Sequence, residues 1–154
     1  MKRRAQIALT PDEQRQYLAD AHTIILATLD RRGYPHAVAM WFVVDPDGTV
    51  VMTTFQKSQK AVNLRRDPRC ALLVESGSRY AELKGLLLRG RALLDAETEH
   101  VLDVLERING KYQQWPGDGL RDALRAQAAK RLVIRVQPER VTSWDHSKLG
   151  PGVY

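Results

Sequence analysis

The sequence predicts a mainly-β protein of the α+β class, built as an antiparallel barrel of six to seven strands with flanking helices. Short segments rich in β-branched and aromatic residues follow one another with only tight turns between them, which favours hairpins over helical crossovers. Gly85 and Gly90 interrupt a later apolar segment, as is typical of the bends in a curved sheet. At 154 residues the chain is expected to be one domain, 1–154, with tails at 1–9 and about 146–154.

The amino-terminal part predicts a helix followed by three strands. Thr10 is a good capping residue, Pro11 suits the first helical turn and two acidic residues follow, so a helix is expected from there to about residue 20 or 21. The turn sequences Asp30-Arg31-Arg32-Gly33 and Asp45-Pro46-Asp47-Gly48 separate three strands, expected at 23–29, 35–44 and 49–55. These strands would form a meander of neighbouring hairpins.

Residues 53–75 predict the end of a strand, a short helix and a second strand. Ser58 is suited to cap the helix, and Pro68 disfavours helical geometry in the residue before it, so the helix should end by Asp67. An apolar strand is expected to follow at 70–74.

The start of this short helix is a candidate anion site. The backbone N–H groups of a first helical turn are unpaired and carry a partial positive charge, and Lys57 and Lys60 add two cations beside Ser58. The same pattern also fits a capped surface helix with solvated lysines. These residues alone leave the two interpretations open.

The carboxyl-terminal part predicts further strands and two helices. A strand is expected at 82–94. A helix should follow from Asp95 to about Gly110, with one apolar face formed by Val101, Leu102, Leu105 and Ile108. The remaining elements are expected to be a loop at 115–119, a helix at about 120–130, a strand at 131–136, a turn at 137–139 and a strand at 140–144.

Composition and charge argue against several classes of protein. A single cysteine, Cys70, rules out an internal disulfide, and its apolar neighbours indicate a buried side chain rather than a nucleophile. No apolar segment is long enough for a membrane helix and no secretory signal is recognisable, so we expect a cytoplasmic protein without membrane contact. The net charge is +6, but the basic residues are scattered among acidic ones, so no nucleic-acid partner is expected.

The sequence contains no self-sufficient set of catalytic residues. Its four histidines are far apart and do not have the spacing of metal ligands, so no metal site is predicted. It has no nucleophile elbow, phosphate-binding loop or dinucleotide fingerprint. If the protein is an enzyme, a bound cofactor would have to supply the reactivity.

The segment 53–69 resembles a known family. Its strand Thr53-Thr54, the run Lys57-Ser58-Gln59-Lys60 and especially Asn63-Leu64-Arg65-Arg66-Asp67-Pro68-Arg69 resemble the pyridoxamine 5′-phosphate oxidase-like split β-barrel superfamily. Within it they are most similar to the branch of flavin- and deazaflavin-dependent oxidoreductases. The resemblance extends in element order over about residues 15–145. It implies a split β-barrel and a homodimer, with a cofactor, deazaflavin coenzyme F420 or FMN, in a groove near the subunit interface.

The resemblance also assigns cofactor-binding residues around the short helix. Ser58 and Lys60 match the residues that hold the cofactor phosphate in this branch, and Lys57 is a looser match. Asn63 matches the asparagine of the following helix, whose role in the family can be structural.

Two strands complete the cofactor groove that the resemblance implies. Thr53 and Thr54 match the strand that lines it, and Met40 and Trp41 match the strand that runs along the ring system. True pyridoxamine phosphate oxidases end with an arginine-rich tail that grips the substrate phosphate. Residues 143–149 lack that tail, so pyridoxine phosphate is not the expected substrate.

The function that the resemblance implies is an F420-dependent oxidoreductase, a reductase that transfers a hydride from the reduced cofactor to a conjugated small-molecule acceptor. The alternatives are an FMN-binding oxidoreductase and a non-catalytic cofactor- or tetrapyrrole-binding protein with His36 or His146 as axial ligand. No catalytic residue is assigned, because a proton could come from Tyr80, His146 or water. The glutamate tail of F420 would suit dispersed basic residues such as Arg65, Arg66 and Arg89.

Overall fold

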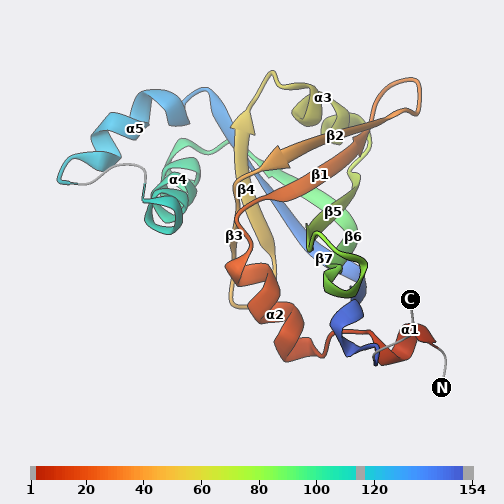
Figure 1. The fold of residues 1–154 in the computed structure, drawn as a ribbon. Coiled ribbons are helices and arrows are strands. Elements are labelled where there is room, and N and C mark those ends of the chain that lie inside the picture. Colours follow the sequence, from red (N-terminus) through yellow and green to blue (C-terminus); the bar gives the residue numbers. More distant parts are fainter. Residues whose placement is uncertain (1–2, 114–116, 151–154) are drawn as a thin grey trace.

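Seven antiparallel strands form one curled sheet in the computed structural model, which describes residues 3–113 and 117–150 (Figure 1). Neighbouring strands follow the order β2-β1-β5-β6-β7-β4-β3. The strands are β1 (Ile24–Leu29), β2 (Pro35–Met40), β3 (Val43–Val44), β4 (Val50–Phe55), β5 (Arg69–Ser76), β6 (Lys84–Asp95) and β7 (Arg131–Asp145). The sheet curls into a half-barrel, which confirms the expected fold class.

The helices flank this sheet, and the start signal predicted at Thr10 is present, whereas the helix predicted from Asp95 begins at Thr98. Thr10 Oγ1 accepts the Glu13 N–H at 3.3 Å while the Glu13 carboxylate accepts the Thr10 N–H at 2.7 Å, so the predicted cap is present. None of the described helices is both long and apolar enough to cross a membrane. They are α1 (Arg3–Gln6), α2 (Pro11–Asp20), α3 (Gln59–Arg66), α4 (Thr98–Tyr112), α5 (Leu120–Ala128) and the 3₁₀ helices η1 (Tyr80–Glu82) and η2 (His146–Lys148).

The single strand predicted at 35–44 is wrong, because the chain leaves the sheet edge at Trp41 and Phe42. β2 pairs with β1 at one edge, whereas β3 pairs with β4 at the other. The backbone between them is held from α4 instead of by a strand: the Phe42 N–H donates to the Tyr112 hydroxyl at 3.1 Å. The expected meander is therefore two hairpins at opposite edges of the sheet.

The turn predicted at 137–139 is also wrong, since β7 runs through it as one strand. β6 pairs with β7 along its whole length, with a shift in register between Arg89 and Gly90. Pro138 lies opposite Gly90 at this bulge, where a missing N–H donor is tolerated. A Cβ on Gly90 would come within 2.6 Å of the Gln137 carbonyl oxygen, so the glycine permits the close approach.

Two apolar cores stabilise the fold, one inside the half-barrel and one under α4. The predicted apolar face of α4 is confirmed, because Val101, Leu102, Leu105 and Ile108 are all buried against β4 and β7 in the second core. Cys70 lies in the first core, where burial raises the pKa of its thiol to about 11, as expected for a structural cysteine.

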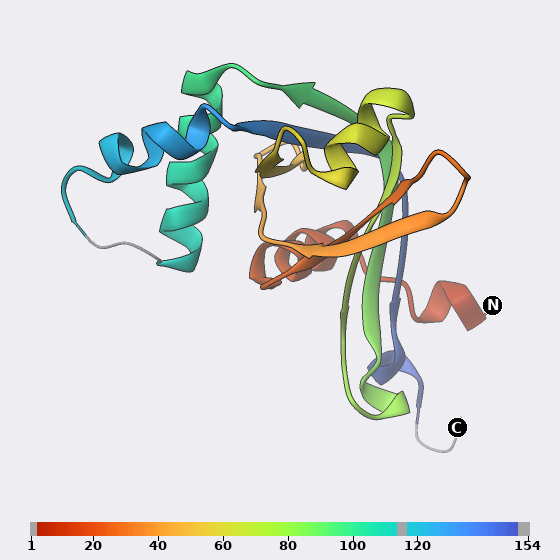
Figure 2. The same cartoon turned by 90° about the horizontal axis from the view of Figure 1, so that it is seen from above.

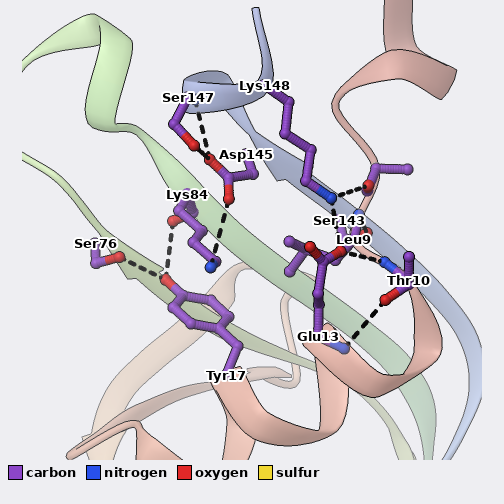
Figure 3. Close-up of polar contacts among 11 residues, drawn as sticks. Leu9, Thr10, Glu13, Tyr17, Ser76, Lys84, Ser143, Asp145, Ser147 and Lys148 are labelled. Carbon is purple, nitrogen blue, oxygen red and sulfur yellow. Dashed lines mark hydrogen bonds and ion pairs between the residues drawn. The ribbon is translucent and has the colours of Figure 1, made fainter.

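The segments expected as tails meet at one end of the sheet, where their described parts contain α1 and η2 (Figure 3). The Leu9 N–H donates to Ser143 Oγ at 3.0 Å, and Lys148 Nζ lies 2.6 Å from the Glu13 carboxylate. Lys84 Nζ lies 3.4 Å from the Asp145 carboxylate on the neighbouring strand. The first two contacts fasten Ser143 and Lys148 to the amino-terminal segment, and the third joins β7 to β6, on the side away from α4 and α5 (Figures 1 and 2).

Candidate functional site

The loop between β4 and α3 places the predicted anion site. Ser58 Oγ accepts the Ala61 N–H at 3.3 Å, which confirms the predicted cap, and also accepts the Thr54 O–H at 3.1 Å. Because both contacts use the oxygen as an acceptor, the Ser58 O–H is still able to donate to a ligand. Lys57 is exposed beside Ser58 and has no ion pair within the described residues.

Lys60 lies half-buried in the first turn of α3. Burial lowers the pKa of its ammonium group, and the positive charge of Arg131 lowers it further. Over residues 3–113 and 117–150, no carboxylate forms an ion pair with Lys60. Within the described residues, the charge of Lys60 is therefore not balanced by a carboxylate.

Arg131 is a second cation at this corner, and the sequence reasoning missed it. It begins β7, directly opposite Phe55 in the register of β4, and its guanidinium carbon lies 4.2 Å from the centre of the Phe55 ring. Its Nη1 lies 3.5 Å from Thr53 Oγ1. The only sequence signal was a basic residue at a strand start, which is common on protein surfaces.

A cleft of about 510 Å³ adjoins this corner, between the sheet and the α4–α5 pair. Trp41 forms part of its wall and stacks on Tyr112 of α4, with ring centres 4.4 Å apart and planes 6° from parallel. The wall from the two helices is largely apolar, a feature that the helix predictions did not connect with the site. The lining residues are Ala39, Met40, Trp41, Thr53, Leu105, Ile108, Asn109, Leu120, Leu124, Gln127 and Arg131.

The two threonines of β4 point to opposite sides of the sheet. Thr53 lines the cleft together with Met40 and Trp41. Thr54 is 4% exposed, and its hydroxyl group donates a hydrogen bond to Ser58 Oγ. Thr53 therefore faces the cleft, whereas Thr54 faces away from it and contacts Ser58.

The most recognisable part of the sequence, 63–69, serves the fold. Asn63 is fully buried, donates to Thr28 Oγ1 at 3.0 Å and accepts from Gln59 Nε2 at 2.8 Å, so it ties α3 to β1. Hydrogen bonds from Arg69 lower the pKa of the Asp67 carboxyl to about 2. The side chains of Arg65 and Arg66 donate to backbone carbonyls, those of Gln56 and Leu29.

The candidate proton donors lie elsewhere in the chain. His146 Nδ1 is 2.9 Å from the Tyr80 carbonyl oxygen, and the centres of the two side-chain rings are 4.6 Å apart. Neither residue lines the cleft. His36 lies on β2, whereas His146 lies in η2, and His36 does not line the cleft either. Within the described residues, no three His, Cys, Asp or Glu side chains gather as metal ligands would.

Comparison with known proteins gives consistent similarities. Residues 10–145 match the family described as pyridoxamine 5′-phosphate oxidase. An F420H(2)-dependent biliverdin reductase of Mycobacterium tuberculosis is 33% identical over 131 residues, which cover 84% of this chain and 85% of that protein. A conserved hypothetical protein of M. tuberculosis has a crystal structure with a TM-score of 0.88 and 37% identity, over 97% of this chain and 93% of the other. A structure named F420 reductase has a TM-score of 0.70 at 23% identity, over 86% of this chain and 98% of that one.

Proposed function

The chain belongs to the pyridoxamine 5′-phosphate oxidase family, and on that premise we propose that it is an oxidoreductase of the F420-dependent kind. Its substrate would be a conjugated small molecule, and the reduced deazaflavin would supply the hydride that this acceptor takes up. The biliverdin reductase of M. tuberculosis, at 33% identity over most of both chains, supports F420 over FMN and makes tetrapyrroles the first substrates to try.

The observation that carries the proposal is the position of Lys60 near Ser58, with no carboxylate partner for Lys60 in the part of the chain that the structure describes. Lys60 would form a charge-assisted hydrogen bond with the cofactor phosphate, and the Ser58 O–H would donate a second one. The free N–H groups of the first turn of α3 add to the same attraction. A half-buried lysine without a carboxylate costs stability in the free protein, so a bound phosphate gives it a physical purpose.

The cleft supplies the other half of the site. Trp41, held flat by Tyr112, offers an aromatic surface for a planar ring system, and Met40 lies beside it. Apolar side chains of α4 and α5 would exclude water from the reacting atoms and hold acceptor and cofactor in contact. No side chain of the described cleft is assigned a proton-transfer role.

Paired binding and turnover measurements test this proposal. The purified protein should bind F420 more tightly than FMN in fluorescence titrations, and it should oxidise F420H₂ with at least one acceptor from a panel of quinones, enones and biliverdin. Tighter binding of FMN would favour the alternative cofactor. Binding of F420H₂ without oxidation by any acceptor would refute the reductase and leave a cofactor carrier.

We further propose that the protein is a homodimer that pairs through the outer face of β2, β1, β5 and β6. Ala39, Ile25, Leu73 and Leu87 lie side by side across these four strands, and none belongs to either core. A row of apolar side chains on an open sheet face is a surface that a second subunit would cover.

Leu73→Glu should therefore convert the dimer to a monomer in light scattering coupled to gel filtration, because it places a charge in the middle of the covered face. Val141→Glu is the matched control. Val141 is 41% exposed and pairs with Leu88, which lies on the other face of the sheet from Leu73. A Leu73→Glu protein with unchanged mass would show that another surface pairs the subunits or that none does.

A further inference from the structure

Arg131 differs from the arginines of α4 and α5, and from Arg135 on its own strand, in how its charge is balanced. Arg107 and Arg135 pair with Asp45, Arg121 contacts three carboxylates and Arg125 pairs with Glu99. Arg131 has no carboxylate partner in the described part of the chain, although it is half-buried and its Nε atom is fully buried without a hydrogen bond. Buried charges are normally paired, so this exception needs an explanation.

Contacts to its backbone and to its guanidinium group hold Arg131 in place. The Gln56 N–H donates to the Lys130 carbonyl at 3.0 Å, and Gln56 Nε2 donates to the Arg131 carbonyl at 3.0 Å, so the backbone is fixed. The guanidinium carbon lies 4.2 Å from the centre of the Phe55 ring, and Thr53 Oγ1 lies 3.5 Å from Nη1. A fixed, planar donor group loses little entropy when it binds an oxyanion.

The surroundings of Arg131 select the kind of anion. Arg131 pairs with Phe55 at the end of β4, and Lys60 lies in the first turn of the helix that follows this strand, so both cations belong to the same corner. The charge of Arg131 lowers the pKa of the Lys60 ammonium group, and the two positive charges together favour a group that carries negative charge. Arg131 also lines the cleft, whose other walls are Trp41, Met40 and the apolar residues of α4 and α5. A ligand that fits both the positive corner and the apolar cleft has an oxyanion attached to a planar, largely apolar ring system.

We propose that Arg131 is an oxyanion-binding residue of this cleft, aided by the charge of Lys60 at the adjoining corner, and that it takes the phosphate or carboxylate group of a planar conjugated ligand. The choice of test ligands rests on the proposed function, in which F420 carries a phosphate and a tetrapyrrole acceptor carries carboxylates. Arg131 would then orient the ligand by a two-point hydrogen bond that a lysine cannot reproduce.

The test compares Arg131→Gln with Arg140→Gln by fluorescence titration. Arg140 is exposed on the same strand and lies outside the cleft, so its substitution changes the net charge equally. Two matched ligand pairs identify the anion: F420 against its deazaflavin–ribitol fragment without phosphate, and biliverdin against its dimethyl ester. Arg131→Gln should lower the affinity for at least one of the two anionic ligands by about tenfold or more. The affinity for the neutral counterpart of that ligand should not change.

The pattern of losses then names the source of the oxyanion. A loss confined to F420 assigns the cofactor phosphate, and a loss confined to biliverdin assigns the acceptor carboxylate. The proposal would be overturned if Arg131→Gln lost as much affinity for a neutral ligand as for its anionic counterpart. It would also be overturned if Arg140→Gln lost as much affinity as Arg131→Gln. Arg131→Lys, which keeps the charge, should recover only part of the affinity.

Inorganic pyrophosphate separates this proposal from the proposed function. It should raise the melting temperature of the wild-type protein and of Arg140→Gln, and raise that of Arg131→Gln much less. This result would stand even if neither F420 nor biliverdin bound to the wild-type protein, which would refute the proposed function alone. The same shift in all three proteins would refute the role of Arg131.

Discussion

Replacing Lys60 with alanine is expected to weaken the binding of F420 by about 1.5–3 kcal/mol, or roughly tenfold to a hundredfold, because a charge-assisted hydrogen bond to the phosphate is lost. Lys60 is the half-buried cation at the start of α3 and has no competing carboxylate in the described residues. Fluorescence titration at two salt concentrations measures the effect. Added salt should weaken binding to the wild-type protein more than to the variant, since part of the attraction is screened.

Lys57→Ala is the control for this experiment, since it removes the same charge three residues earlier from an exposed side chain. Its effect should be smaller, because solvent screens an exposed charge more strongly than a half-buried one. Equal effects of the two substitutions would contradict a specific phosphate contact at Lys60. No effect of either would move the phosphate site away from the start of α3.

Lys60→Met separates loss of binding from loss of structure. Methionine keeps most of the apolar stem and removes the ammonium group, whose charged form is disfavoured by burial, as the lowered pKa shows. The melting temperature of this variant should therefore equal or exceed that of the wild-type protein, while its affinity for F420 falls. A side chain that lowers the stability of the free protein but strengthens the binding of its ligand is typical of a binding site.

The sequence signals that proved reliable are local ones. The cap at Thr10, the cap at Ser58 and the helix stop before Pro68 each depend on residues within a few positions of one another, and all three are present. The apolar spacing of α4 is of the same kind. Local chemistry of this sort is readable before any tertiary contact is known.

The signals that failed were overridden by contacts distant in sequence. Val43 and Val44 have strong strand propensity, but they pair with β4 while β2 pairs with β1, so one apolar run is divided between two edges. Pro138 indicated a turn, but the bulge opposite Gly90 accommodates it within β7. Neither pairing can be derived from the residues of the segment itself.

The candidate site was predicted only in part for the same reason. Ser58 and Lys60 are neighbours in the sequence, so their shared role could be proposed from it. Arg131 reaches the same corner only because β7 pairs with β4, and the apolar wall exists only because α4 and α5 fold over that part of the sheet. The part of the site that discriminates between ligands is the part that depends on the fold.

Phe42→Ala is expected to lower the free energy of unfolding by about 3–5 kcal/mol, which is a large share of the stability of a domain this size. Phe42 is fully buried in the first core, and Lys111 Nζ lies 3.8 Å from its ring centre. Alanine would leave a cavity and remove that contact. Denaturant unfolding followed by circular dichroism measures the loss.

Phe55→Ala provides the comparison. Because Phe55 is 52% exposed, its replacement should lower the free energy of unfolding far less. The two variants should also differ in function. Phe42 adjoins Trp41 in sequence, at the point where the chain crosses between sheet edges, so its loss should loosen the aromatic wall of the cleft. Phe55 contacts the Arg131 guanidinium instead. Its replacement by alanine should therefore weaken the binding of anionic ligands while leaving the fold intact. A stability loss for Phe42→Ala no larger than that for Phe55→Ala would show that the crossing segment can relax into the cavity, and that the wall of the cleft is less rigid than its contacts indicate.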